Sequence, residues 1–293
     1  MNYTLRVMTF MTLLVFSFFG FSQIHERIDS LFYVIKQEDD NKKKVDHYIS
    51  LIRIYRDIDL SKTEDLAGKA ISLAEEANYS HGIAKINNEL GWSYFMRGDQ
   101  ETAKNKFLAA LAVCEDFKLE SFKGAVYNSL GALHGSLGEY DTSLSFFQKS
   151  LDVKKEFENK DQIPNTINNI ANVYKLQGKT EDALATYEEA VSLYLEMGID
   201  NGLADTYSNA GLGYQMIGNF PKALEYLQKS LDVATDHYNL VEKVNALHNL
   251  GLLYEESDQT EESLNYYHQA LQIYDSLDDQ KGVGTINGNI GVV

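Results

Sequence analysis

Two columns of polar side chains, each repeating every 40 residues, are the part of this sequence best suited to bind a ligand. The first column consists of Asn88, Asn128, Asn168, Ser208 and His248. The second column follows one residue later and consists of Glu89, Ser129, Asn169, Asn209, Asn249 and Asn289. An amide carries both a hydrogen-bond donor and an acceptor, and these groups pair with the backbone of an extended peptide. The first column therefore predicts a ladder of peptide contacts, with hydrogen bonds that bridge neighbouring helices as the alternative. For the second column the two explanations are equally good.

Nucleophiles and metal ligands, by contrast, form no pattern typical of an enzyme. The histidines show no H-E-x-x-H motif and no paired helical spacing, which argues against a metal site; they are His25, His47, His81, His134, His237, His248 and His268. Cys114 is the single cysteine, and we expect it to be a buried apolar residue rather than a nucleophile. The glycine-rich segment 282–288 lacks the lysine of a phosphate-binding loop. We therefore expect no catalytic residue, no metal and no cofactor within this sequence.

The composition predicts an acidic, helical protein. Only two prolines, Pro164 and Pro221, interrupt 293 residues, and a hydrophobic fraction of 44% is enough for a core. The chain has 26 basic and 43 acidic residues, which gives a net charge of −17. Because nucleic acids and anionic membranes bind clustered positive charge, we do not expect them as main partners.

Residues 1–22 have the composition of a secretory signal peptide. One charged residue, Arg6, precedes an apolar run that ends at Phe21, and the small residues Gly20 and Ser22 form a cleavage signal. The run is shorter than the ~20 residues that a membrane-spanning helix needs, which disfavours an uncleaved anchor. We expect cleavage after Ser22 and export of the remaining chain.

Apolar residues within each 40-residue unit predict a pair of helices. Between residues 83 and 96 they recur at intervals of three and four, which is typical of one buried helix face. A glycine that would end the first helix follows in four units, as Gly98, Gly138, Gly178 and Gly218. Candidate N-caps of the second helix are Asp99, Thr180, Asn219 and Thr260. A further apolar column is expected in the core and consists of Leu31, Ile71, Leu111, Leu151, Val191, Leu231 and Leu271.

The repeated unit resembles the tetratricopeptide repeat. The pattern L-G-x2-Y, followed by A-x3-F and a further alanine, is matched at all six positions by Leu90, Gly91, Tyr94, Ala103, Phe107 and Ala110. Later units keep the size or apolar character of these residues. The early tryptophan and the closing proline of the family are absent, and the unit has 40 residues. The resemblance implies an all-α fold, a right-handed solenoid of antiparallel helix pairs.

The resemblance also implies that the first helix of each pair, helix A, lines a concave groove. With the first column, the groove residues would then be Trp92, Phe95, Asn172, Lys175, Leu212, Gln215 and Met216. The lysines with which some members clamp chaperone tails are missing from the first column, so we exclude that ligand class.

We divide the chain by its repeat register. Residues 1–22 are the signal peptide, 23–41 an N-terminal capping helix and 42–81 a degenerate repeat. Five repeats follow at 82–121, 122–162, 163–202, 203–242 and 243–282, and a truncated sixth occupies 283–293.

The expected function is non-catalytic binding of a protein or extended peptide. By resemblance, the array would be the extracytoplasmic sensor part of a membrane-anchored signalling protein, a histidine kinase or transcriptional regulator that continues beyond residue 293. The alternative is a stand-alone periplasmic or surface scaffold for envelope protein assembly. Membrane contact is expected only through a segment beyond residue 293.

Overall fold

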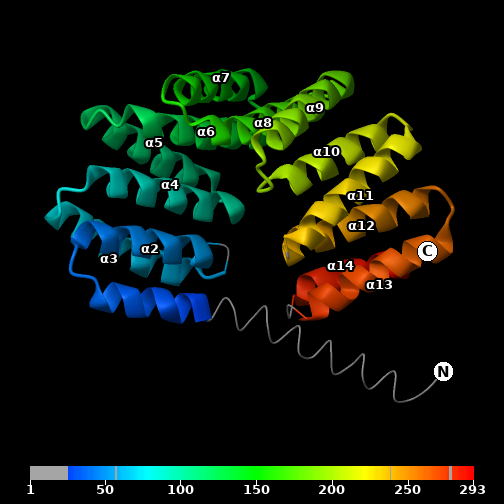
Figure 1. Cartoon of the computed structure of the whole chain (residues 1–293), viewed down its shortest axis with the longest axis horizontal. Helices are drawn as coiled ribbons and strands as arrows, with labels where there is room; N and C mark the ends of the chain where they lie inside the picture. Colours follow the sequence, from blue (N-terminus) through cyan, green and yellow to red (C-terminus); the bar gives the residue numbers. More distant parts are fainter. Residues whose placement is uncertain (1–25, 57, 238, 277–278) are drawn as a thin grey trace, which may run out of the picture. The chain divides into compact units, whose positions relative to one another are not determined.

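The first helix of each pair ends beside a residue in the left-handed conformation, with a positive φ, and this residue recurs every 40 positions. The glycines at 98, 138, 178 and 218 have φ between +72° and +80°, and Asp258 takes the same place with φ +57°. Because a left-handed residue stops an α-helix, these positions separate the two helices of each pair as predicted. The computed structural model describes residues 26–56, 58–237, 239–276 and 279–293 (Figure 1). The predicted signal peptide, residues 1–22, lies outside them.

The described residues form helices and no strands, which confirms the predicted all-α class. Residues 26–37 are helical. The A helices are α2 (Asn41–Tyr55), α4 (Ser80–Met96), α6 (Glu120–Ser136), α8 (Ile163–Leu176), α10 (Leu203–Met216), α12 (Leu240–Glu256) and α14 (Gln280–Ile290). The B helices are α3 (Leu60–Glu76), α5 (Gln100–Asp116), α7 (Tyr140–Glu156), α9 (Thr180–Met197), α11 (Phe220–Asp236) and α13 (Thr260–Ser276). A short 3₁₀ turn, η1 (Lys160–Gln162), precedes α8.

The chain divides into two compact units, and the point of division lies within α8. The first ends at Asn169 and the second is Ile170–Val293. In the first unit α2 packs on α3, α4 on α5 and α6 on α7, and α4 also contacts the A helices before and after it. In the second unit α10 packs on α11 and α12 on α13, and α10 contacts α12. Each unit is thus a stack of helix pairs. None of the helices in the described residues is long and apolar enough to cross a bilayer.

A glycine of helix A and a large side chain of helix B fit together in successive pairs. A Cβ atom on Gly91 would lie 2.4 Å from the ring of Phe107, and one on Gly251 would lie 2.4 Å from the ring of Tyr267. No real Cβ atom tolerates that distance, so the small residue of the motif is what allows the ring to enter. Phe107 and Tyr267 are fully buried as a result.

The predicted core column at Leu111 is wrong in part. Leu111 is only partly buried, and of the seven members of that column only Leu151 and Val191 are buried, each 7% exposed. The fully buried face of α5 consists instead of Ala103, Phe107, Ala110 and Cys114, at helical spacings of three and four. Residue 111 follows Ala110 and is turned about 100° away from that face. Cys114 is buried, as predicted, and burial raises the pKa of its thiol to about 11.

Two of the four predicted N-caps are confirmed. Asp99 accepts a hydrogen bond from the Thr102 amide, and Asn219 accepts one from the Lys222 amide. The N-cap prediction is wrong for Thr180 and Thr260, because these residues are the first helical residues of α9 and α13. The residues directly before these B helices are at positions 99, 139, 179, 219 and 259. The N-cap position therefore lies one residue before Thr180 and one residue before Thr260.

We expect Asp258→Gly to stabilise the protein. An L-residue in the left-handed conformation costs about 1 kcal/mol, partly offset by the chain entropy of glycine, so a gain of a few tenths to about 1 kcal/mol is expected. Urea denaturation measures it, and the converse change Gly98→Asp should lower stability by a similar amount. A loss of stability in Asp258→Gly would show that this residue does not hold the positive φ.

Candidate functional site

Consecutive A helices are joined by hydrogen bonds between the two polar columns. Asn169 Nδ2 donates to Asn128 Oδ1 at 3.3 Å, and Asn249 Nδ2 donates to Ser208 Oγ at 2.8 Å. Asn289 Nδ2 lies 2.8 Å from His248 Nε2. Each bond spans 41 residues, from the second column of one repeat to the first column of the repeat before it. Bridging between helices, the alternative that the sequence left open, therefore occurs at these three positions.

The same bond is missing at Asn88. The residue 41 positions later is Ser129, whose Oγ instead donates to the carbonyl of Ala125 at 3.1 Å. Asn88 is 7% exposed, and its Oδ1 is a buried atom without a hydrogen-bond partner. A serine side chain is too short to form the hydrogen bond that an asparagine forms at this place in other repeats. The Asn88 oxygen on α4 therefore has no bridging partner on α6.

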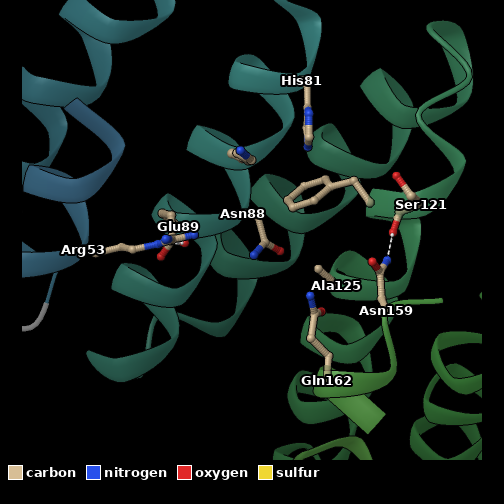
Figure 2. Close-up of a pocket in the computed structure, with 10 residues that line it drawn as sticks. Arg53, His81, Asn88, Glu89, Ser121, Ala125, Asn159 and Gln162 are labelled. Carbon is tan, nitrogen blue, oxygen red and sulfur yellow. Dashed lines mark hydrogen bonds and ion pairs between the residues drawn. The ribbon is translucent and has the colours of Figure 1, made fainter. Parts of the chain in front are cut away.

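A pocket of about 440 Å³ lies beside Asn88 (Figure 2). Three consecutive A helices and the turn around η1 form its walls, through Arg53, His81, Lys85, Asn88, Glu89, Ser121, Phe122, Ala125, Asn159 and Gln162. On α4, His81, Lys85 and Asn88 are four and three residues apart and so share one helix face. The volume falls within the range of ordinary ligand sites, which is roughly 300 to 1,000 Å³.

A buried carboxylate holds the α2 side of the pocket together. Arg53 Nε lies 2.7 Å from Glu89 Oε1, and Arg56 contacts Glu89 Oε2 at 3.1 Å. The Glu89 side chain is 7% exposed, whereas that of Arg53 is 56% exposed. Lys85 Nζ is 3.6 Å from Asp46 Oδ1. Two cationic residues, Arg53 and Lys85, thus line a pocket of a chain whose net charge is strongly negative.

The opposite wall is aromatic and less charged. The His81 ring meets the Phe122 ring edge-on at 5.2 Å between centroids. Burial, and then the charge of Lys85, lower the pKa of His81, so its imidazole is neutral near neutral pH. Asn159 Nδ2 donates to the Ser121 carbonyl at 3.3 Å and ties the turn before η1 to α6. The site therefore combines cationic, amide and aromatic groups around one pocket.

Of the twelve groove residues predicted from the sequence, Asn88 is the one that lines this pocket. Trp92 and Phe95 are partly buried and pack on each other at 5.3 Å, within the core between α4 and α5. Asn128 forms the bridge to Asn169, and Asn168 is 7% exposed. Their roles as ligand contacts stay predictions.

The other seven predicted residues belong to the unit Ile170–Val293. Ser208 and His248 form bridges, and Asn172 accepts a hydrogen bond from the Tyr187 hydroxyl. Lys175 Nζ donates to Asn209 Oδ1 at 3.3 Å, and burial lowers its pKa. Leu212 is partly buried and Gln215 bonds Glu256. Met216, named with them, is 61% exposed.

Sequence reasoning did not identify the cationic and aromatic lining of the pocket. Helical spacing backwards from Asn88 could have found Lys85 and His81, and the 40-residue register could then have added Ser121 and Ala125. No such signal marks Arg53, because it lies in residues 42–81, the repeat that departs most from the motif.

We expect an asparagine-to-leucine substitution to lower stability where the asparagine bridges two helices and to raise it where the asparagine oxygen is unpaired. Asn249→Leu removes the bridge to Ser208 and should lower the free energy of unfolding by about 1 kcal/mol. Asn88→Leu removes a buried unpaired oxygen and should raise it by up to about 1 kcal/mol. Thermal denaturation compares the two variants. Equal destabilisation by both would mean that Asn88 has a structural partner.

One family model matches the chain. The sequence profile described as "Tetratricopeptide repeat" matches residues 123–196, 162–236 and 202–276. No curated protein sequence matches the chain.

Solved structures with a similar fold include a Rap protein complexed with Competence and Sporulation Factor, at 13% identity and a TM-score of 0.69, over 90% of this chain and 80% of that one. NprR in complex with its cognate peptide NprX matches at 15% identity and a TM-score of 0.61, over 92% and 82%. A signal transduction ATPase with a tetratricopeptide repeat sensor, from Pyrococcus horikoshii, matches at 17% identity and a TM-score of 0.60, over 89% and 41%. At these identities the likeness concerns the fold.

Proposed function

The chain belongs to the tetratricopeptide repeat family, and from this premise we propose that it is a non-catalytic scaffold that binds an extended peptide or protein segment along its A helices. In the unit that ends at Asn169, the pocket beside Asn88 is the centre of this binding surface. Its lining supplies hydrogen-bond donors and acceptors together with an aromatic wall, which suits a polypeptide.

The unpaired oxygen of Asn88 is the observation that carries the proposal. A buried polar atom without a partner costs roughly 1 to 3 kcal/mol, and an apolar side chain would avoid that cost. Asn88 lines a pocket large enough for a ligand, so a donor from a bound peptide is the simplest source of the missing hydrogen bond.

Two of the similar structures contain a bound partner, and in one of them the partner is a peptide. The Rap structure contains Competence and Sporulation Factor, and the NprR structure contains the peptide NprX. In the unit that ends at Asn169, we expect the first-column residues Asn88 and Asn128, on the neighbouring helices α4 and α6, to contact one extended backbone.

Affinity selection tests the proposal. The full chain is immobilised and exposed to short peptides of random sequence, and retained peptides are identified by mass spectrometry. We expect a defined subset to be retained and to compete with one another for a single site. Retention that does not exceed that of an immobilised unrelated helical protein would contradict peptide binding.

The cellular context is a finer part of the same proposal. We place the binding unit outside the cytoplasm, as the sensor part of a membrane-anchored histidine kinase or transcriptional regulator; the similar fold of a tetratricopeptide repeat sensor is in keeping with this role. A stand-alone periplasmic or surface scaffold for envelope assembly is the second candidate. The acidic charge disfavours nucleic acid as a partner in either case.

Export has a direct test in the expressed protein. The composition of residues 1–22 predicts that the mature chain begins at Gln23 and is found in the extracytoplasmic fraction. Mass spectrometry of the fractionated protein measures both features. An intact N-terminus in the cytoplasmic fraction would contradict export without affecting peptide binding.

A further inference from the structure

We propose that Lys154 is a positioning residue for the pocket beside Asn88, and that its buried amine makes one wall of this pocket sensitive to pH. The wall is the turn around η1, which supplies Asn159 and Gln162 to the pocket (Figure 2). Lys154 lies on α7, does not line the pocket itself and acts on it through this turn. The effect on a peptide rests on the proposed peptide binding, whereas the effect on the turn does not.

The amine of Lys154 joins α7 to the turn and to α8. The side chain is almost completely buried, with 3% exposed. Its Nζ donates to the Gln162 carbonyl at 3.2 Å and to Thr166 Oγ1, in the first turn of α8, at 2.6 Å. Its stem packs on α6, where a Cβ atom on Gly124 would lie 3.3 Å from Lys154 Cγ. One side chain thus fixes the turn from three helices.

Two backbone hydrogen bonds extend this contact to the pocket residues. The Asn159 amide donates to the Lys154 carbonyl at 2.9 Å, and the Gln162 amide donates to the Asn159 carbonyl at 3.1 Å. The Asn159 side chain then donates to the Ser121 carbonyl on the pocket rim. Release of the amine from the Gln162 carbonyl would therefore loosen both residues that the turn contributes to the pocket.

The surroundings of the amine suit its neutral form better than its charged form. Both acceptors are uncharged oxygens, and an ammonium has three N–H donors, so one donor is left over among the described residues. Burial without a paired carboxylate disfavours the charge and lowers the pKa of Lys154 to about 8, although the charge of Asp161 on η1 partly opposes this. A change of pH near 8 therefore changes the charge inside this contact.

Asp161 is the neighbouring charge that acts on Lys154. On α6, Lys123 Nζ is paired with Glu120 at 2.8 Å. On α8 no charged residue precedes Lys175. The remaining charged residues of this part of α7 and of the turn are exposed, and they are Asp152, Lys155, Glu156, Glu158 and Lys160. Removal of the Asp161 charge should therefore lower the pKa of Lys154 further.

The direction of the pH effect follows from proton linkage. Opening of the turn exposes the amine to water, where the pKa of a lysine is 10.5. Between about pH 8 and pH 10.5 the open turn holds a proton that the closed turn does not, so each pH unit makes opening up to about 10-fold less favourable. Below about pH 8 the amine is charged in both states, and the cost of burying the charge favours opening in full. The pocket wall is thus loosest below about pH 8.

Hydrogen exchange of residues 157–166 tests the switch without any peptide. Protection factors, corrected for the intrinsic exchange rate, are measured by mass spectrometry from pH 6.5 to pH 9.5 in the full chain. We expect them to be level below about pH 8 and then to rise, by up to about 10-fold per pH unit. Lys155→Met, which removes an exposed charge from the same helix, should keep this profile, and Lys154→Met should abolish its pH dependence. The same rise in Lys154→Met would overturn the inference.

Asp161→Asn provides a second variant that leaves the core intact, because Asp161 is exposed. Its protection factors should begin to rise at a lower pH than those of the unmodified chain. An onset at the same or a higher pH would contradict the part assigned to Lys154.

Peptide affinity then tests the link from the turn to the pocket. With a peptide retained by the unmodified chain, Lys154→Met should weaken binding about 10-fold, and Lys155→Met should leave it unchanged. Equal affinities of the two variants would show that Lys154 does not position the pocket. If no peptide is retained at all, peptide binding is refuted, and hydrogen exchange still decides whether Lys154 controls the turn.

Discussion

Phe107→Ala is expected to lower the free energy of unfolding by about 3 to 5 kcal/mol. The Phe107 ring is fully buried and fills the space above Gly91, where no side chain can replace it. It also packs against Trp92 with 5.7 Å between ring centroids. Its removal would leave a cavity between α5 and α4, the helix that carries four of the ten pocket residues.

The matched variant is Leu111→Ala on the same helix. Leu111 is only partly buried, so its loss should cost less than about 2 kcal/mol, the lower end for a buried leucine. Chemical denaturation of both variants, followed by circular dichroism, measures the difference. If Leu111→Ala proves as damaging as Phe107→Ala, the core lies along the leucine column and the packing described for α5 is incorrect.

The double variant Asn88→Ala, Asn128→Ala should weaken peptide binding by about 10- to 100-fold. Asn88 has an unpaired oxygen, and Asn128 uses its oxygen to accept from Asn169 while its amide nitrogen has no bond in the described residues. Each would therefore contribute a hydrogen bond to the peptide backbone. Fluorescence anisotropy with a peptide retained by the unmodified chain measures the affinity.

Asn105→Ala is the control for this experiment. Asn105 is exposed on α5, a B helix of the same repeat, and its loss should leave the affinity unchanged. The double variant should keep its helical circular dichroism, because it removes one bridging acceptor and no core side chain. Equal affinities in the double variant and in Asn105→Ala would show that the first column does not contact the peptide.

The fold could be predicted from the sequence because local signals and the repeat register agree. Gly98 and its equivalents end helices for a reason that lies in the residue itself, and the pairing of Gly91 with Phe107 follows from size alone. The Leu111 column could not be assigned by the same means, since the direction of a helix face changes by about 100° per residue and an apolar residue beside the core face is common.

The pocket could be predicted only through Asn88. It exists because one bridge of the ladder is absent, and that absence depends on the short side chain of Ser129 rather than on any motif. Arg53 joins the pocket through Glu89, 36 residues away in a repeat of weak register. Asn159 and Gln162 come from the irregular turn around η1. These contacts depend on tertiary packing, which a repeat pattern does not encode.

Site-specific photo-cross-linking tests most directly whether a peptide lies on the A-helix face at the pocket. A photoreactive p-benzoylphenylalanine is placed at Ser121, on the pocket rim, and in a second protein at Leu108, which is 43% exposed on the B helix α5. With a peptide retained by the unmodified chain, we predict a covalent product at position 121 that excess unlabelled peptide abolishes, and none at position 108. Cross-linking at position 108 alone, or equally at both positions, would contradict the account.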